Sequence, residues 1–173
     1  MKIEIMGYSG SGKSTLCREL AERYQLPALH LDQVQFLPNW EIRPEEEKME
    51  QVAAFLDENP KGWVIDGNYS KLSYERRNEE ADRIVQLLFG RIRCLFRCVR
   101  RFRQYRGKSR PDMAEGCSEK LDREFVRWIL WEGRSKTIRE RYRKVREQYP
   151  EKVIVLKNQR QLDRYRKQLG LEG

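Results

Sequence analysis

The feature that most constrains the fold is a glycine-rich segment near the start of the chain, residues 7–15, which reads Gly-Tyr-Ser-Gly-Ser-Gly-Lys-Ser-Thr. It matches the pattern G-x-x-x-x-G-K-[ST], in which a strand leads into a loop that wraps phosphate groups and then into a helix. Residues 2–6 alternate like a short strand, and apolar residues recur at helical spacing after the loop. The segment therefore predicts a strand, a phosphate-binding loop (P-loop) and a helix in succession.

Each residue type in this loop has a physical role. Glycine reaches at low cost the dihedral angles that turn backbone N–H groups inward around a phosphate. We expect Lys13 to contact the β and γ phosphate oxygens and Ser14 to bind Mg²⁺, while the following helix points its positive dipole end at the nucleotide. The predicted nucleotide-binding residues of the loop are Gly7, Ser9, Gly10, Ser11, Gly12, Lys13, Ser14 and Thr15.

Length and composition exclude several other classes of protein. A chain of 173 residues suits one domain, residues 1–173, with one sizeable core. No apolar run approaches the roughly 18 residues of a membrane span, and a strand begins too early for a signal peptide, so we expect a cytoplasmic protein without membrane contact. The four cysteines lack paired C-x-x-C spacing, which indicates reduced thiols rather than a disulfide framework or a zinc site.

The excess positive charge is concentrated in residues 91–110, which hold nine basic residues and no acidic one in a chain of net charge +9. Apolar residues at helical spacing within it predict an amphipathic helix with an arginine-rich face. The apolar stripe would consist of Ile92, Leu95, Phe96, Val99 and Phe102. Three interpretations are open: a solvated basic face, a nucleic-acid patch, or arginines that close over phosphates. The P-loop in the same chain favours the third, because guanidinium groups make bidentate hydrogen bonds to phosphoryl oxygens.

The rest of the chain alternates between predicted strands and helices. We expect strands at residues 27–31, 62–66, 83–89 and 152–156, a loop at 33–43, and helices from Pro44, over 70–81, from Ser118 with a bend at Gly133, and over 161–169. Such alternation implies right-handed crossovers and a parallel sheet covered by helices on both faces. Ligands should lie at the carboxyl ends of the strands, where Gly7, Asp32 and Asp66 fall.

The two aspartates have alternative roles. Asp66 ends a buried strand and would orient Mg²⁺ through water, as a Walker-B carboxylate does, or else cap the strand end. Asp32 is a general base for a hydroxyl acceptor, a group that orients the acceptor, or a loop cap. Phe36 and Trp40 are candidates to wall an acceptor pocket, whereas His30 is expected to be a core residue at a strand end.

Several arginines are candidates for phosphate and acceptor contacts. Arg76 and Arg77 precede a strand and would contact the acceptor, unless they lie on a solvated helix face. We expect a lid and phosphate clamp formed by Arg97, Arg101, Arg110 and Arg134. In this scheme the catalytic residues are Lys13, Asp32, Arg101 and Arg110. Arg97 and Arg101 add to the nucleotide site, and the predicted substrate-binding residues are Asp32, Asn68, Arg77 and Arg134.

Three further motifs give the chain a resemblance to one protein family, and that resemblance covers nearly the whole chain. They are Leu31-Asp32, Asp66-Gly67-Asn68-Tyr69, and the loop 110–117, which reads Arg-Pro-Asp-Met-Ala-Glu-Gly-Cys. Together with the P-loop and the arginine helix, they make the chain similar to the adenylate-kinase-like P-loop proteins called DNA topology modulation proteins. The resemblance implies an α/β fold with a five-stranded parallel sheet of order 2-3-1-4-5, an arginine-bearing lid at about residues 100–118, and ATP-type phosphate donation to a small acceptor. Asn68-Tyr69 stands where typical adenylate kinases carry Phe-Pro-Arg, which argues against AMP as the acceptor.

Two functional hypotheses follow. The first is ATP-dependent phosphoryl transfer, with Mg²⁺ as cofactor, from a nucleoside triphosphate to a small-molecule or nucleotide acceptor. The alternative is a nucleotide-binding regulator that binds DNA through residues 91–110, with an affinity that falls steeply with salt. These patterns leave open the acceptor, the choice between ATP and GTP, and the oligomeric state.

Overall fold

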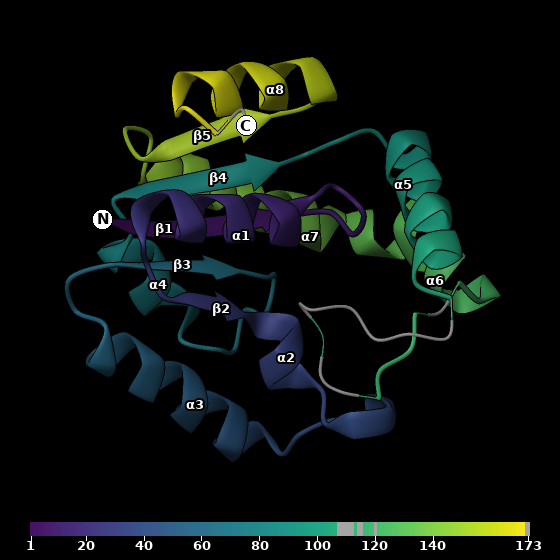
Figure 1. The fold of residues 1–173 in the computed structure, drawn as a ribbon, viewed down its shortest axis with the longest axis horizontal. Helices are drawn as coiled ribbons and strands as arrows, with labels where there is room; N and C mark the ends of the chain where they lie inside the picture. Colours follow the sequence, from purple (N-terminus) through teal and green to yellow (C-terminus); the bar gives the residue numbers. More distant parts are fainter. Residues whose placement is uncertain (107–112, 114–115, 120, 172–173) are drawn as a thin grey trace.

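A single five-stranded parallel sheet forms the centre of the computed structural model, which describes residues 1–106, 113, 116–119 and 121–171 (Figure 1). The strand order is β2-β3-β1-β4-β5, so the predicted 2-3-1-4-5 order is confirmed. The strands are β1 (Lys2–Gly7), β2 (Ala28–His30), β3 (Trp63–Asp66), β4 (Arg83–Leu87) and β5 (Val153–Leu156). Because all pairings are parallel, the carboxyl ends of the strands meet at one edge, where Ile5 is in register with Asp66 and Asp66 with His30.

Helices cover both faces of the sheet, and the alternation of side chains along β1 decides which core each residue joins. Ile3 and Ile5 point to the face covered by α1 (Lys13–Tyr24) and α8 (Gln159–Gln168), where Leu16, Leu20 and Leu162 pack. Met6 points to the opposite face, covered by α3 (Glu45–Glu58) and α7 (Lys136–Gln148). The first of these cores holds α1, and with it the P-loop, against the middle strand β1.

The remaining helical elements are α2 (Leu31–Gln35), the 3₁₀ turn η1 (Pro38–Trp40), α4 (Tyr74–Glu80), α5 (Arg91–Gln104), α6 (Arg123–Leu130) and the 3₁₀ turn η2 (Glu132–Arg134). They lie around the edge where the strands end, except α4, which lies beside the start of β1 (Figure 1). The loop predicted at 33–43 therefore contains helical turns, and β2 ends one residue earlier than expected, at His30. Among the described residues, no helix combines the length and the apolar character that crossing a membrane requires.

The long helix predicted from Ser118 is wrong, because two capping side chains divide it. Asp122 accepts a 2.7 Å hydrogen bond from the Phe125 N–H, and Ser135 accepts one from the Ile138 N–H, so α6 and α7 begin separately. Gly133 lies in the turn between them against Trp128, whose carbonyl oxygen would be 2.9 Å from a Cβ at that position.

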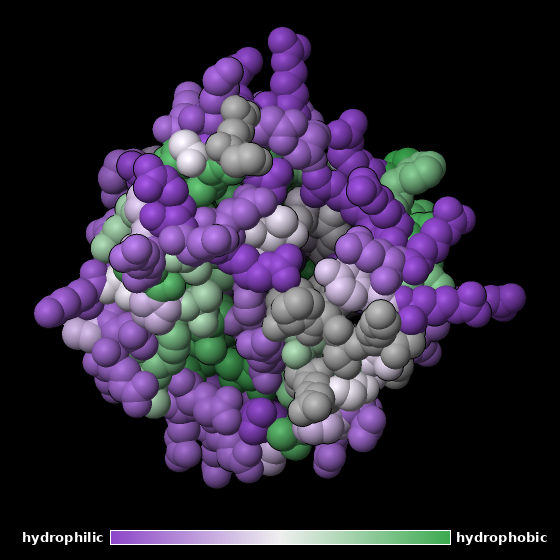
Figure 2. All heavy atoms as spheres, in the orientation of Figure 1, coloured by the Kyte–Doolittle hydropathy of each residue, from purple (hydrophilic) through white to green (hydrophobic). Residues whose placement is uncertain are grey.

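The amphipathic helix predicted within residues 91–110 exists as α5, but its buried stripe differs from the prediction. Cys94 and Cys98 are buried, whereas Ile92 and Phe96 are 59% and 72% exposed. Figure 2 shows hydrophobic atoms over α5 within a largely hydrophilic surface. The physical reason is a close approach to the P-loop: a Cβ on Gly10 would lie 2.5 Å from the Cys94 carbonyl oxygen and 2.6 Å from Cys98 Sγ. Only small side chains on α5 allow that contact.

Candidate active site

The P-loop connects β1 to α1 and has the backbone that its glycines predict. Gly10 and Gly12 have φ angles of +76° and +98°, and Gly12 is the residue before α1 begins at Lys13. The Ser11 N–H donates to the Tyr8 carbonyl at 3.1 Å, which closes the turn. The start of a twelve-residue helix therefore lies directly beneath the loop, with its free N–H groups and positive dipole end toward any bound anion.

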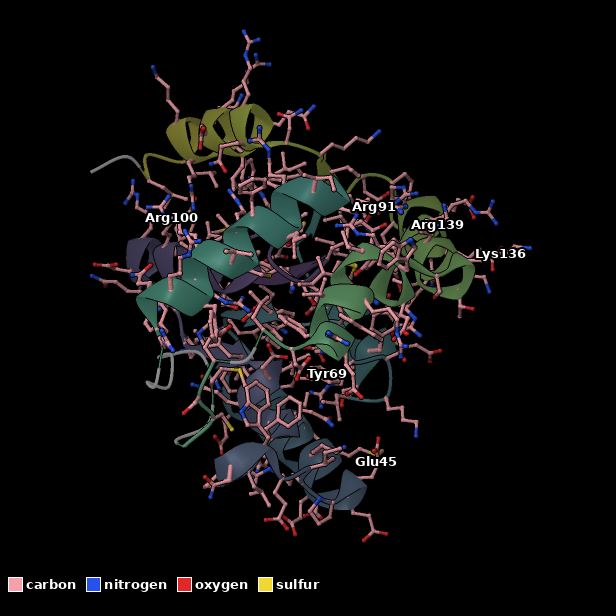
Figure 3. All side chains as sticks on the ribbon, turned by 90° about the vertical axis from the view of Figure 1, so that its right-hand side faces the viewer. Glu45, Tyr69, Arg91, Arg100, Lys136 and Arg139 are labelled. Atoms are coloured by element: carbon pink, nitrogen blue, oxygen red, sulfur yellow. The ribbon has the colours of Figure 1, made fainter. Side chains whose placement is uncertain are left out.

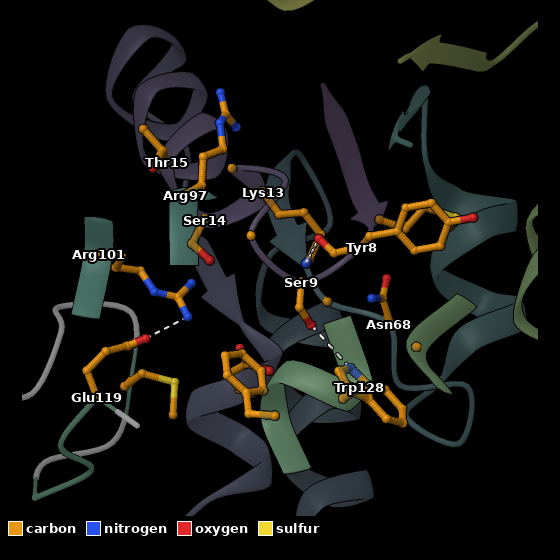
Figure 4. Close-up of a pocket in the computed structure, with 18 of the residues that line it drawn as sticks. Tyr8, Ser9, Lys13, Ser14, Thr15, Asn68, Arg97, Arg101, Glu119 and Trp128 are labelled. Carbon is orange, nitrogen blue, oxygen red and sulfur yellow. Dashed lines mark hydrogen bonds and ion pairs between the residues drawn. The ribbon is translucent and has the colours of Figure 1, made fainter. Parts of the chain in front are cut away.

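Lys13 and Ser14 project from the first turn of α1 (Figure 4). The Lys13 ammonium donates to the Tyr8 carbonyl at 3.3 Å, a long and replaceable hydrogen bond. The Ser14 hydroxyl donates to Oδ2 of Asp66 at 2.9 Å. Asp66, at the end of the neighbouring β3, is 4% exposed, so these two oxygen-bearing groups meet at the base of the loop.

The second carboxylate oxygen of Asp66 has a partner that sequence reasoning assigned only to the core. His30 Nδ1 contacts Asp66 Oδ1, and both side chains are almost fully buried. Cys17 lies close by, with its sulfur and the ligand atoms of His30 and Asp66 all within 4.8 Å of one another. The His30 interaction holds the carboxylate from behind while Ser14 holds it from the P-loop side.

This arrangement fits the Mg²⁺ that P-loops bind. Mg²⁺ prefers oxygen ligands and keeps several waters, and a serine hydroxyl beside a carboxylate supplies both a direct ligand and a partner for those waters. Ser14 and Asp66 are the residues that would hold the ion, and that role stays a prediction.

A large cleft of about 1280 Å³ opens over the P-loop. Its floor is formed by the P-loop and the start of α1, and further walls come from α5, from α2 and η1, from the loop after β3, and from α6 and α7. Figure 3 views the molecule from the side where α5 crosses above Tyr69, with Arg91 and Arg100 toward its two ends. The cleft thus joins segments from the first and last thirds of the chain.

Two of the predicted lid arginines line this cleft from α5 (Figure 4). Arg97 donates to the Ser11 carbonyl at 2.6 Å and its guanidinium lies 4.8 Å from the centre of the Phe89 ring. Arg101 forms a 2.6 Å ion pair with Glu119, whose side chain is nearly buried. Positive charge is therefore fixed on the α5 side of the P-loop, where a polyphosphate would lie.

Asp32 lines the same cleft from α2. The Tyr69 hydroxyl donates to Asp32 Oδ1 at 2.8 Å, and burial together with the nearby Asp32 carboxylate raises the pKa of Tyr69 above its ordinary value. Tyr69 therefore stays a neutral donor, which leaves Oδ2 of Asp32 free of this contact. A carboxylate oriented in this way can accept a proton from a hydroxyl group.

The prediction that Arg77 contacts the acceptor is wrong. Its side chain is fully buried, forms an ion pair with Glu4 of β1, and donates to the carbonyls of Leu72 and Tyr69. Burial raises the pKa of Glu4 to about 7 even beside this guanidinium. Arg76 pairs instead with Asp57 and Glu80. Arg77 thus stabilises the core beneath the site.

Asn68 and Arg134 lie beside the cleft but have partners in the protein. The Asn68 amide accepts a 3.0 Å hydrogen bond from the Gly7 N–H and donates to the Gly7 carbonyl, so both of its polar atoms hold the start of the P-loop. Arg134 lies 3.8 Å from the centre of the Tyr8 ring and donates to the Phe89 carbonyl at 2.9 Å. Arg110, with residues 107–112, 114 and 115 of the predicted lid, lies outside the described residues.

The cleft residues that sequence reasoning missed include Trp128, Glu119 and Arg141. Trp128 Nε1 donates to the Ser9 hydroxyl at 3.3 Å, and Arg141 donates to the Asn68 carbonyl at 3.4 Å. A signal for Trp128 was present in the helical spacing of residues 125–145, but that spacing also predicts an ordinary core face. Glu119 has no such pattern around it.

The fold and the site together define a P-loop nucleotide-binding protein with a kinase-like fold. The family described as "AAA domain" (AAA_18) matches residues 3–127, and the chain belongs to that family. No curated protein matches the chain.

Three solved structures are similar to the chain over nearly its whole length. TT1252 from Thermus thermophilus has a TM-score of 0.56 at 17% identity, covering 100% of this chain and 98% of its own. An unliganded sugar kinase from Janibacter sp. HTCC2649 has a TM-score of 0.50 at 15% identity, covering 98% and 94%. A gluconokinase from Sinorhizobium meliloti 1021 has a TM-score of 0.49 at 16% identity, covering 98% and 90%. At these identities the first two describe the fold alone.

Proposed function

We propose that this protein is a kinase that transfers the γ-phosphoryl group of Mg·ATP to a small acceptor. The observation that carries the proposal is that one cleft is lined by Lys13 and Ser14 at the P-loop, with Asp66 buried behind Ser14, and by Asp32 on a separate wall. A nucleotide-binding site alone would not require the second carboxylate. The fold shared with a protein described as a sugar kinase is compatible with this function.

On the donor side, the loop amides and Lys13 would bind the β and γ phosphates. Mg²⁺, held by Ser14 and through water by Asp66, would supply charge neutralisation on those phosphates. Arg97 is already fixed against the P-loop backbone, so it would contribute preorganised positive charge. Arg101 is ion-paired with Glu119 and would exchange that carboxylate for a phosphoryl oxygen. Arg110 stays a predicted catalytic residue of the lid.

On the acceptor side, Asp32 would act as the general base. Its Oδ1 is occupied by the Tyr69 hydroxyl, so Oδ2 would take the proton of the acceptor hydroxyl as that oxygen attacks the γ-phosphorus. Tyr69 fixes the orientation of the carboxylate, which saves reorganisation when the acceptor binds.

The alternative function, DNA binding through residues 91–110, has less support. Three of the basic residues on α5 line the cleft, namely Arg97 and Arg101, which are half-buried, and Arg100, which is also exposed. The outward side of α5 carries exposed Arg93 and Arg103 but also exposed Ile92 and Phe96. Assignment to the topology modulation group stays a proposal that rests on the sequence motifs.

The test measures binding first and transfer second. Titration calorimetry with Mg·ATP and Mg·GTP should give saturable binding, and a screen of hydroxyl and phosphate acceptors should give acceptor-stimulated ADP release. Lys13→Ala should abolish transfer, whereas Lys136→Ala, whose side chain is 86% exposed on α7, should leave it unchanged. Absence of nucleotide binding by folded protein would refute the proposal.

A further inference from the structure

The wall of the cleft that faces away from α1 and α8 is lined mainly by aromatic rings. This acceptor side consists of the segment from α2 through η1, the loop between β3 and α4, the first residue of α4, and the cleft face of α7. Its aromatic residues are Phe36, Trp40, Tyr69, Tyr74 and Tyr142. Rings from four separate segments therefore meet on one wall, which offers flat apolar surfaces to a bound molecule.

Two of these rings are held in place by contacts outside the cleft. Phe36 and Trp40 pack edge to face, with ring centroids 5.1 Å apart and planes at 70°. Trp40 also donates through Nε1 to the Ser118 carbonyl at 3.0 Å and through its backbone to Cys117 Sγ at 3.3 Å. Both side chains are only half-buried. A rigid, half-buried aromatic pair is preorganised for stacking against a planar ligand.

The charges on this side do not suit a doubly charged phosphate acceptor. The two arginines that the sequence suggests for binding an acceptor phosphate have other partners. Arg77 is buried against Glu4, and Arg76 pairs with Asp57 and Glu80. Within the described residues, Arg141 is the one cation that the acceptor side places in the cleft, and Asp32 offsets its charge. A nucleoside monophosphate would therefore bring its phosphate close to a carboxylate with little compensation.

The polar groups are also too few for a polyhydroxylated acceptor. Both polar atoms of the Asn68 amide are bonded to Gly7, and the Tyr69 hydroxyl is bonded to Asp32. A sugar or sugar acid carries a hydroxyl on nearly every carbon, and each one buried without a partner weakens binding. What this wall offers is the Asp32 carboxylate, the Arg141 guanidinium and a large flat apolar surface, which matches a molecule that combines few hydroxyls with an aromatic ring better than a sugar.

We infer that the acceptor is a planar heteroaromatic molecule with a free hydroxyl, of the class represented by nucleosides. This inference rests on the proposed kinase function. The base of the acceptor stacks among Trp40, Phe36 and Tyr69, and its sugar hydroxyl points to Asp32. The hydroxyl oxygen forms a bond to the γ-phosphorus, the bond from that phosphorus to the β–γ bridging oxygen breaks, ADP leaves with the electron pair, and Asp32 takes the proton.

The experiment compares three acceptor classes in one ADP-release assay with Mg·ATP. The panel contains purine and pyrimidine nucleosides, their 5′-monophosphates, and aldoses with their aldonic acids. We expect at least one nucleoside to be phosphorylated with a kcat/KM ten or more times that of its monophosphate and of any sugar or sugar acid. Turnover confined to monophosphates or to sugars would overturn the inference while leaving the kinase function intact. Mg·ATP binding with no transfer to any class would reject both.

Variants of Trp40 test whether the aromatic wall is responsible for binding the acceptor. Trp40→Leu should raise the KM for the nucleoside about tenfold or more with the KM for ATP unchanged, because stacking is lost. Trp40→Phe should restore most of the affinity. The matched control is Ile42→Ala, at a side chain 62% exposed two residues along the chain, which should behave as wild type. Equal effects of Trp40→Leu and Trp40→Phe on the KM for both substrates would contradict the stacking role.

Discussion

The Ser14 hydroxyl lies 2.9 Å from Oδ2 of Asp66 and donates a hydrogen bond to it, linking the P-loop to the end of the adjacent strand. The opposite oxygen of the same carboxylate contacts His30 Nδ1. Asp66 therefore has a partner on each side and little freedom to rotate. A carboxylate that orients metal-bound water depends on such support, since outer contacts fix the direction of its lone pairs.

We predict that His30→Ala raises the Mg²⁺ concentration needed for half-maximal ATP binding by about 10- to 100-fold, the usual effect of removing an outer partner of a metal site. His30→Asn, which keeps an N–H donor, should recover most of the loss. Calorimetric titration of ATP at a series of Mg²⁺ concentrations measures both.

Cys17→Ala provides the control for this pair of variants, because Cys17 is buried in the same cluster but its sulfur contacts the Val64 carbonyl at 3.7 Å. It should leave the Mg²⁺ requirement within about twofold of wild type. If His30→Asn raises the Mg²⁺ requirement as much as His30→Ala does, the packing of the imidazole ring rather than its hydrogen bond maintains the orientation of the Asp66 carboxylate.

Gly10→Ala should abolish Mg·ATP binding and lower the free energy of unfolding by about 1–3 kcal/mol, because Gly10 has a φ of +76° and its new Cβ would lie 2.5 Å from the Cys94 carbonyl oxygen. Gly90→Ala is the matched control: no atom lies within 4 Å of a Cβ there. Its unfolding free energy should stay within about 1 kcal/mol of wild type. Nucleotide binding retained by Gly10→Ala would show that α5 can move away from the loop.

The parts of this molecule that the sequence predicts are those governed by local spacing. The strand, loop and helix around residues 7–15 follow from glycine conformation and apolar periodicity, and Asp66 follows from its place at the end of a buried strand. Those rules act within a few residues, so they hold before the tertiary structure is known. For that reason both predicted aspartates lie at the site: Asp32 lines the cleft, and Asp66 lies behind Ser14 at its base.

Errors arose where a distant partner decides the environment of a side chain. Arg77 looks like a surface cation in its own helix, yet Glu4, 73 residues away, provides a buried carboxylate for it. On α5, the contact with Gly10 selects Cys94 and Cys98 for burial over the more apolar Ile92 and Phe96. Neither partner is visible in local periodicity.

Asn68→Ala should weaken Mg·ATP binding and reduce the free energy of unfolding by about 1–3 kcal/mol, because it leaves the N–H and carbonyl of Gly7 without their side-chain partner. The nearby Ser70→Ala, at an exposed position, should change neither quantity. Urea denaturation and calorimetry separate the two effects. A normal unfolding free energy with impaired acceptor turnover alone would instead favour the direct substrate contact that the sequence predicted for Asn68.

The buried pair of Glu4 and Arg77 predicts a pH dependence of stability. Burial raises the pKa of Glu4 from 4.5 to about 7, so between these values the folded protein holds a proton that the unfolded chain has released. Stability from Glu4 is therefore fully present below about pH 4.5 and is lost as the pH rises through 7. Relative to Glu4→Gln, which does not titrate, the wild type should lose unfolding free energy on the order of 3 kcal/mol across this range, since each pKa unit corresponds to about 1.4 kcal/mol.

Urea denaturation at pH 5 and pH 8 measures the unfolding free energy of the wild type and of Glu4→Gln. Subtracting one from the other at each pH removes the contribution of all other titrating groups, because both proteins share them. At pH 8 Glu4→Gln also leaves the Arg77 charge buried without a carboxylate, so the absolute stabilities of the two proteins differ for a second reason. Only the change of the difference with pH reports on Glu4. If the advantage of the wild type instead grows as the pH rises, attraction to Arg77 outweighs burial, and Glu4 is ionised throughout the range in which the protein is folded.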